Sequence, residues 1–156
     1  MINFNSLLNQ QSSEDTRSFI IHFPANSGKT DFAKRATAQH PDIYYLDIQG
    51  KFLEQDELPP ISKFRLSYLK KYLLGIQVPQ EFIIIDNSDF LFNTWKSEEK
   101  QAFIHWIKSE LRSPADTKKT FIFFIQSDDI LATSQLKNTY GQSRILSLND
   151  FEEFKP

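Results

Sequence analysis

The sequence predicts a three-layer α/β fold in which a parallel five-stranded sheet lies between two layers of helices. Short apolar runs that are nearly continuous, rather than alternating, are typical of strands covered on both faces. Stretches with apolar residues at helical spacing separate these runs, as crossover helices separate parallel strands. The length of 156 residues fits one domain over 1–156. We expect its core over 17–150 and a leading helix or tail over 1–15.

Five apolar runs are the expected strands. The first four are rich in β-branched and aromatic residues, which favour strands, and the fifth is weaker because Ser147 interrupts it. In chain order, the runs are 19–23, 43–46, 82–85, 121–125 and 145–148.

Helices are expected where apolar residues recur every three or four positions. Leu66, Leu69 and Leu73 share one helical face, and Ser97 is followed by acidic residues that favour a first helical turn. The predicted helices are 30–40, 61–74, 97–112 and 129–138, preceded by a leading helix over 3–10.

Composition excludes several kinds of site. The chain has no Cys, which excludes disulfides, Cys-ligated zinc and Cys nucleophiles, and its three His have no metal-like spacing. Fifteen Phe predict a Phe-rich core. The net charge of −2 supplies no general attraction for nucleic acid, so contact with DNA would depend on a local patch or on assembly. The N-terminus lacks a signal-peptide pattern, and no apolar run is long enough to span a membrane.

The main motif follows the first expected strand. Residues 23–30 read Phe-Pro-Ala-Asn-Ser-Gly-Lys-Thr and match the second half of the phosphate-binding pattern G-x-x-x-x-G-K-[ST]. In such loops backbone N–H groups face the phosphates, the Lys reaches the β- and γ-phosphates, and the Thr ligates Mg²⁺. The expected nucleotide-binding residues are Asn26, Ser27, Gly28, Lys29 and Thr30.

The loop departs from the pattern at its entry. Phe23 stands where the first Gly belongs, and Pro24 has no N–H to offer. Gly permits unusual backbone dihedrals that Phe resists, so we expect weaker nucleotide binding or an altered loop.

A second motif is the run 82–85 followed by Asp86, which is typical of the strand that holds Mg²⁺ in nucleotide-binding proteins. We expect Asp86 to hold Mg²⁺ together with Thr30; the alternative is a core strand with a capping Asp. Asn87 stands where ATPases with an additional strand between these two motifs usually carry a Glu that activates water. An amide cannot accept the proton, although it can orient a water. Asp89 either substitutes as the carboxylate or caps a helix, and we favour the cap.

Two weaker signals complete the expected catalytic set of Asn87, Gln126, Ser127 and Arg144. Gln126 and Ser127 follow the run 121–125, where a polar side chain can contact the γ-phosphate or the attacking water. Arg144 precedes the last run and can reach a neighbouring subunit's nucleotide as an arginine finger; the alternative is a surface Arg.

A basic run on the expected helix 61–74 has two interpretations. Its cations are a solvated helix face or a surface for nucleic acid or an acidic partner, and we favour the solvated face. The residues are Lys63, Arg65, Lys70 and Lys71.

With these motifs in place, residues 17–150 resemble the core of an AAA+ type P-loop ATPase without its helical lid. The resemblance implies the strand order 5-1-4-3-2, ATP and Mg²⁺ as cofactors, and assembly into a homo-oligomer or with other proteins. The loop and the sequence from Asp86-Asn87 to Asp89, Leu91 and Phe92 also resemble the BrxF family, the small lidless P-loop proteins of BREX phage-defence systems. That resemblance implies a cytoplasmic, bacterial anti-phage role in a multi-protein assembly that acts on DNA, with any DNA contact indirect.

The expected function is therefore that of a minimal ATP-binding module whose hydrolysis is slow, absent or dependent on a partner. One alternative is a pseudo-ATPase adaptor that kept the fold and lost the nucleotide. Another is a small nucleotide kinase, which needs an Arg-rich lid, whereas residues 113–126 offer only Lys118 and Lys119 as cations.

Overall fold

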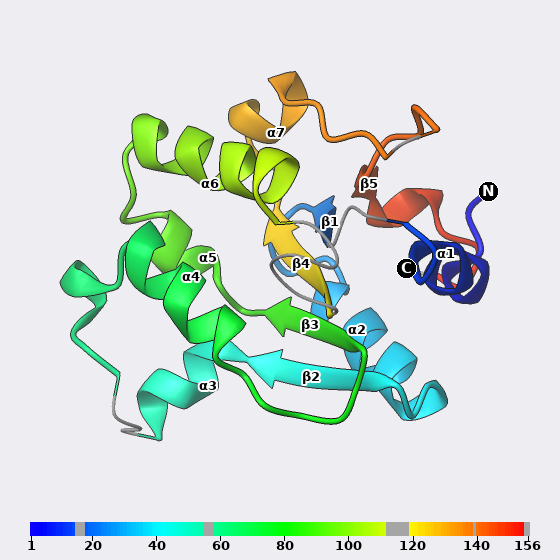
Figure 1. The fold of residues 1–156 in the computed structure, drawn as a ribbon, viewed down its shortest axis with the longest axis horizontal. Helices are drawn as coiled ribbons and strands as arrows, with labels where there is room; N and C mark the ends of the chain where they lie inside the picture. Colours follow the sequence, from blue (N-terminus) through cyan, green and yellow to red (C-terminus); the bar gives the residue numbers. More distant parts are fainter. Residues whose placement is uncertain (15–17, 55–57, 112–118, 139, 155–156) are drawn as a thin grey trace.

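A parallel five-stranded sheet forms the middle layer of the molecule (Figure 1). The computed structural model describes residues 1–14, 18–54, 58–111, 119–138 and 140–154. The strands are β1 (Ser18–Phe23), β2 (Ile43–Asp47), β3 (Phe82–Asp86), β4 (Thr120–Gln126) and β5 (Ile145–Ser147). Their order is β2-β3-β4-β1-β5, which reads 5-1-4-3-2 from the β5 edge, and every neighbouring pair is parallel. The predicted α/β class and parallel five-stranded sheet are confirmed.

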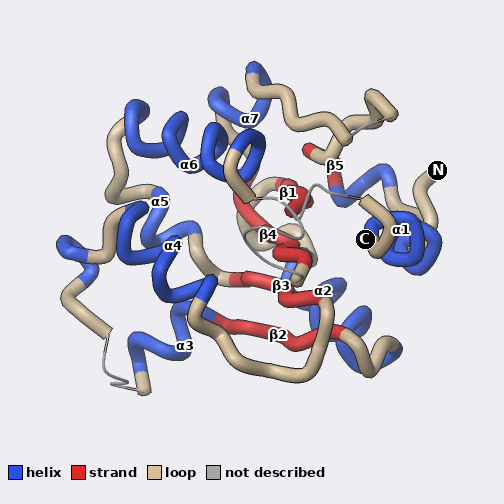
Figure 2. Tube along the Cα trace, viewed as in Figure 1, coloured by secondary structure: helices blue, strands red, loops and turns tan. Residues whose placement is uncertain are grey.

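Helices cover both faces of this sheet. They are α1 (Phe4–Gln11), α2 (Lys29–Gln39), α3 (Ile48–Leu53), α4 (Leu66–Leu74), α5 (Asp89–Phe92), α6 (Ser97–Ser109) and α7 (Asp129–Thr133), with 3₁₀ turns η1 (Ile61–Lys63) and η2 (Leu148–Asp150). Figure 2 shows α1 and α2 on one side of the strands and α4, α5 and α6 on the other. None of the helices in the described part of the chain has the length and apolar character that a membrane crossing requires.

Each face of the sheet has its own apolar core, because alternate residues of a strand point to opposite faces. Ile83 and Ile85 of β3 pack in the cluster that includes α4 and α6, whereas Ile84 packs in the cluster with α1 and α2. Aromatic pairs contribute to both cores; the rings of Phe103 and Phe123, for example, meet edge to face with centroids 5.0 Å apart. The predicted Phe-rich core is confirmed.

The leading helix is also confirmed. Phe4, Leu7 and Leu8 are buried, and the Asn3 side chain caps α1 by accepting a hydrogen bond from the backbone N–H of Ser6 at 2.9 Å. The last residue of the predicted segment 1–15 lies outside the described residues.

Three helix boundaries differ from the prediction. Helix α4 begins at Leu66 rather than at 61, because Phe64 turns into the core and its carbonyl oxygen accepts the indole N–H of Trp95 at 3.1 Å. Helix α7 ends at Thr133 rather than at 138, since the chain becomes extended at Ser134. Helix α6 ends at Ser109, and position 112 lies outside the described residues. The sequence analysis missed α3, whose N-terminus the Asp47 side chain caps.

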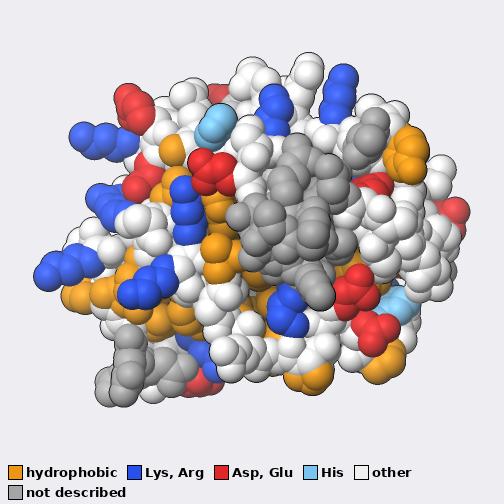
Figure 3. Space-filling model, in the orientation of Figure 1, with side chains coloured by type: hydrophobic (Ala, Val, Ile, Leu, Met, Phe, Trp, Pro, Cys, Tyr) orange, Lys and Arg blue, Asp and Glu red, His pale blue; other side chains and the backbone are white. Residues whose placement is uncertain are grey.

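The basic run around α4 is partly neutralised by α6. Arg65 pairs with Glu99 at 3.2 Å and Lys70 with Glu110 at 3.4 Å. Figure 3 shows Lys and Arg side chains interspersed with acidic and apolar ones over this face. This arrangement is that of a solvated helix face, in which exposed ion pairs contribute little to stability.

Candidate functional site

A cavity of about 290 Å³ lies at the carboxyl ends of β1, β3 and β4. Ligands of parallel α/β sheets bind at this edge. Three segments that are distant in the sequence meet there: the loop after β1, the residues after β3 and the end of β4. The lining residues are Ala25, Asn26, Ser27, Gly28, Lys29, Thr30, Asp31, Asp86, Asn87, Asp89 and Gln126. The structure thus brings together all of the predicted site residues except Ser127 and Arg144.

The loop between β1 and α2 has two residues in the left-handed backbone region. Asn26 has φ 56° and Gly28 has φ 101°. Asn tolerates this region better than most residues, and Gly adopts it without steric cost. A Cβ atom at Gly28 would in addition lie 3.2 Å from Cε2 of Phe154. The conformation and the close approach together explain why Gly occupies position 28.

Phe23 does not strain the loop entry, contrary to the expectation from its sequence position. It is the last residue of β1, it pairs with Gln126 of β4, and its carbonyl oxygen accepts the backbone N–H of Ser127 at 3.1 Å. Its ring packs edge to face on Phe154, with centroids 5.3 Å apart. Phe fits here because the backbone is an ordinary strand and the ring has an aromatic partner.

Lys29 is buried at the start of α2. Its ammonium group donates to the carbonyl oxygens of Phe23 at 3.2 Å and Pro24 at 2.9 Å. The Ser27 hydroxyl also donates to the Pro24 carbonyl. Burial lowers the pKa of Lys29, while the nearby Asp89 and Asp86 carboxylates act in the opposite sense. An ammonium carries three donors, so one of them is without an acceptor among the described residues.

Asp86 is buried and has a partner that the sequence analysis missed. Its Oδ2 accepts the Tyr45 hydroxyl at 2.7 Å. Burial, with this hydrogen bond, raises the pKa of Tyr45, so the hydroxyl stays a donor. Tyr45 of β2 lies opposite Ile84 of the neighbouring strand β3. Asp86 follows Ile84 by two residues, so it is the diagonal neighbour of Tyr45 on the same face of the sheet. The contact between Tyr45 and Asp86 follows from the register in which β2 and β3 pair, and the sequence does not show that register.

Asn87 connects three elements. Its Oδ1 accepts the Thr30 hydroxyl at 3.3 Å, and its Nδ2 donates to Asp47 Oδ1 at 3.0 Å. The same Asp47 oxygen caps α3 by accepting the backbone N–H of Gly50 at 3.0 Å. Asn87 also has φ 59°, a conformation that Asn adopts more readily than Glu. The backbone conformation therefore gives a physical reason for Asn rather than Glu at position 87.

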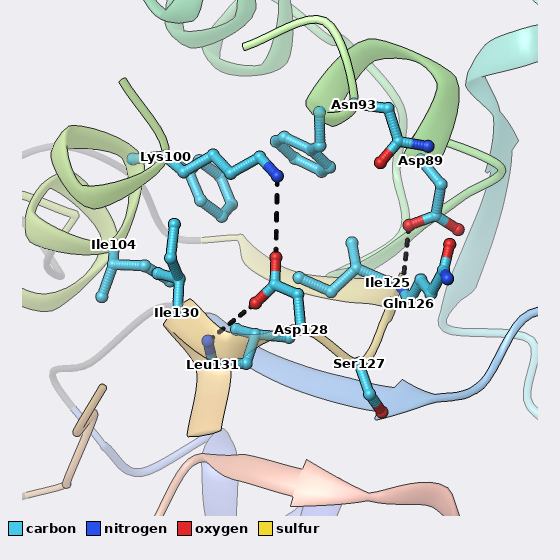
Figure 4. A pocket seen from close by; sticks show the side chains of 12 residues that line it. Asp89, Asn93, Lys100, Ile104, Ile125, Gln126, Ser127, Asp128, Ile130 and Leu131 are labelled. Atoms are coloured by element: carbon cyan, nitrogen blue, oxygen red, sulfur yellow. Dashed lines mark hydrogen bonds and ion pairs between the residues drawn. The ribbon is translucent and has the colours of Figure 1, made fainter. Parts of the chain in front are cut away.

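Asp89 does not cap α5, so the favoured cap interpretation was wrong. Its Oδ1 instead accepts the backbone N–H of Gln126 at 2.7 Å, which ties α5 to the end of β4. Burial raises the pKa of Asp89, and the Gln126 N–H and Lys29 act in the opposite sense. The Gln126 side chain lies beside this carboxylate (Figure 4).

Ser127 faces away from Asp89 and Gln126 (Figure 4). Its hydroxyl lies 2.8 Å from Nδ1 of His22 on β1. Burial lowers the pKa of His22, against the opposing effect of Asp150 and Asp128. The predicted contact of Ser127 with phosphate or water therefore has no support in this geometry, whereas Gln126 is well placed for one.

A second, smaller cavity of about 100 Å³, whose lining is drawn in Figure 4, shares Asp89 and Gln126 with the first. Its floor is apolar, with Phe103, Ile104 and Ile125 among the lining residues. Lys100 and Asp128 form an ion pair at 3.8 Å across it. This cavity was not predicted from the sequence, because its residues come from helices and a strand end that carry no motif.

Arg144 is not part of the site. It precedes β5, and because β1 and β5 are parallel, it lies toward the amino ends of the strands, away from the loop. Its side chain is 4% exposed and its Nη2 pairs at 2.5 Å with Oε1 of Glu14, whose side chain is fully buried. Neither an arginine finger nor a surface Arg describes this geometry, because the guanidinium is held inside its own chain.

The donor set suits Mg²⁺ that arrives with phosphates. The Thr30 hydroxyl and the Asp86 carboxylate are hard oxygen ligands, and Mg²⁺ is usually bound by one or two protein ligands together with phosphates and water. Within the described ranges, no group of three or more His, Cys, Asp or Glu side chains is arranged to hold a metal by itself. Thr30 and Asp86 are the residues of this cavity whose oxygens could hold a metal.

Comparison with known proteins gives no family for this chain. A scan against protein-family models found no match, and a search of curated proteins found no significantly similar sequence.

Proposed function

We propose that this protein is a P-loop ATP-binding protein with the three-layer P-loop NTPase fold, and that it binds ATP with Mg²⁺ in the larger cavity. The observation that supports this most strongly is convergence. One cavity at the carboxyl ends of adjacent parallel strands is lined by residues 27–30, Asp86 and Gln126. If the short loop motif had arisen by chance, Asp86 after β3 and Gln126 at the end of β4 would have no reason to line the same cavity.

The loop has the physical means to hold phosphates. The N-terminus of the eleven-residue helix α2 offers unpaired backbone N–H groups and a positive dipole end. The remaining Lys29 donor would reach the outer phosphates, and Thr30 with Asp86 would hold the metal. Bound Mg²⁺ would neutralise phosphate charge beside the carboxylates of Asp86 and Asp89.

Turnover by the chain itself is slow in this proposal. Both ends of the Asn87 side chain are already engaged, by Thr30 and by Asp47. In line with the AAA+ and BrxF resemblances, we propose that the module works in a homo-oligomer or with other proteins of a cytoplasmic bacterial anti-phage defence system. Any contact with DNA would be through the assembly.

A pseudo-ATPase adaptor is the second candidate. The observation that favours it is that two key polar groups of the site already bond to the protein itself. Lys29 gives two of its three donors to loop carbonyls, and Asp86 accepts the Tyr45 hydroxyl. A nucleotide kinase has less support, because it needs an Arg-rich lid and residues 113–126 contain only Lys118 and Lys119 as cations.

Titration of labelled ATP in the presence of Mg²⁺ tests the proposal. Wild type should bind, and Lys29→Ala should bind at least about tenfold more weakly, because it loses the charged phosphate contact. Lys34→Ala is the matched control, since Lys34 is an exposed Lys on the same helix. Thermal unfolding is a second readout: ATP at 100 times its Kd should stabilise the fold by about 2.7 kcal/mol. Equal and negligible binding by all three proteins would favour the adaptor.

A further inference from the structure

The Asp89 carboxylate stands at the boundary between the two cavities. It lines both of them, with Gln126 beside it (Figure 4). The Gln126 backbone N–H fixes one oxygen, Oδ1, at 2.7 Å. The other oxygen, Oδ2, has no hydrogen-bond donor among the described residues. The carboxyl group is thus held by one oxygen while the second remains able to take a proton.

The other polar groups of the larger cavity are less suited to accept a proton. Asp86 is buried and bonded to Tyr45. Asp31 is exposed and pairs with Arg35 at 2.9 Å. Asn87 is an amide with both ends engaged, and amides are not bases at neutral pH. Asp86 is the carboxylate expected to hold Mg²⁺ and Asp31 faces solvent, so Asp89 is the carboxylate of this cavity left to accept a proton from a reacting water.

The surroundings also suit a base. Burial raises the pKa of Asp89, with Asp86 and Asp128 acting in the same sense and the Gln126 N–H and Lys29 in the opposite sense. A raised pKa brings the proton affinity of the carboxylate closer to the working pH of a general base. Geometry supplies the position, and the environment adjusts the proton affinity.

We propose that Asp89 is the general base of ATP hydrolysis in this protein, an inference that rests on the proposed ATP binding. Asp89 Oδ2 accepts a proton from a water held between it and Gln126. The water oxygen bonds to the γ-phosphorus as the bond from that phosphorus to the β–γ bridging oxygen breaks. The products are ADP and inorganic phosphate, and Asp89 afterwards returns its proton to solvent. Asp89, three positions after Asp86, thereby supplies the carboxylate that is absent at position 87.

Substitution Asp89→Asn tests this role. Asn keeps an oxygen that can accept the Gln126 N–H but removes the base. Single-turnover assays with the full chain in excess over γ-labelled ATP should show a fall in rate of at least about 100-fold. The Kd for ATP in the presence of Mg²⁺, measured from the rise in thermal midpoint, should stay within about threefold of the wild-type value. Asp129→Asn is the matched control, because Asp129 is also the first residue of a short helix but lies outside both cavities.

The outcomes separate the two proposals. If wild type does not bind ATP, the proposed function is wrong. If ATP binds but is not measurably hydrolysed, or if Asp89→Asn hydrolyses it as fast as wild type, only the role of Asp89 is wrong. Asp89→Glu keeps a carboxylate and should hydrolyse ATP at a rate between those of wild type and Asp89→Asn. If Asp89→Asn does not fold, the pH profile of wild type decides. The rate should rise as one carboxylate loses its proton and then level off, and a rate independent of pH overturns the proposal.

Discussion

The rings of Phe23 and Phe154 pack edge to face, with centroids 5.3 Å apart and an interplanar angle of 79°. Phe23 ends the first strand and Phe154 belongs to the C-terminal segment, so this contact fastens that segment over the start of the loop. Phe154 also contacts Phe32 on α2 and approaches Gly28. The aromatic residue at the loop entry is thus part of a packing arrangement that includes strand, loop and C-terminal segment.

Removal of the Phe154 ring should destabilise the protein by about 3 kcal/mol, the usual cost of replacing a buried Phe with Ala. Urea denaturation of Phe154→Ala against wild type measures this. Tyr140→Ala is the control, because Tyr140 is 74% exposed and its loss should change the free energy of unfolding by less than about 0.5 kcal/mol. Similar small losses in both variants would show that Phe154 does not hold the loop.

The left-handed conformation of Asn87 can be tested by comparing two truncations. Asn87→Ala and Asn87→Gly both lose the hydrogen bonds to Thr30 and Asp47, but only Gly adopts φ 59° without strain. Asn87→Ala should therefore be less stable than Asn87→Gly by about 1 kcal/mol in chemical denaturation. If the free energy of unfolding of Asn87→Ala equals or exceeds that of Asn87→Gly, the backbone at position 87 lies outside the left-handed region.

Stability should depend on pH through Asp89 in a defined direction. Because its pKa is raised on folding, the folded state holds this proton more tightly than the unfolded state, and the free energy of unfolding falls as pH rises through the folded-state pKa. Asn resembles the protonated form, so Asp89→Asn should be more stable than wild type at pH 7. The difference should vanish below the ordinary carboxyl pKa of about 4.

Denaturation of both proteins across this pH range measures the effect, and Asp129→Asn serves as the control for a change of net charge. A difference that grows on acidification would contradict the assigned direction.

The buried pair of Arg144 and Glu14 should be important for stability rather than for turnover. Arg144→Met leaves Glu14 buried without its cation and should cost about 3 to 5 kcal/mol. The double variant Glu14→Met, Arg144→Met should be less destabilised than the single one, since it removes the unpaired charge as well. Denaturation of the two variants measures this. An unchanged stability of Arg144→Met together with slower hydrolysis would instead revive the arginine finger.

The sequence was sufficient for the features that depend on local pattern. Continuous apolar runs predicted each strand end to within one residue, because strands covered on both faces exclude polar side chains. The loop and Asp86 were assigned from their positions after such runs, and parallel strands bring those positions to one edge. Convergence of Lys29, Thr30, Asp86 and Gln126 on one cavity followed from that rule.

Features that depend on tertiary contacts could not be predicted. Tyr45 reaches Asp86 through the register of two strands, and Arg144 is buried by Glu14, which lies 130 positions away in the sequence. The start of α4 was misplaced because the contact of Phe64 with Trp95 overrode an adequate helical pattern. Asp89 was assigned to a cap for lack of any sign that the Gln126 N–H would hold it.

A structure of the full chain determined with a nonhydrolysable ATP analogue and Mg²⁺ would show whether ATP binds in the cavity beside residues 27–30. We expect the phosphates to lie against residues 27–30, the metal on Thr30 and Asp86, and a water beside Asp89 and Gln126. Absence of nucleotide at saturating concentration, or nucleotide bound away from this loop, would contradict this expectation.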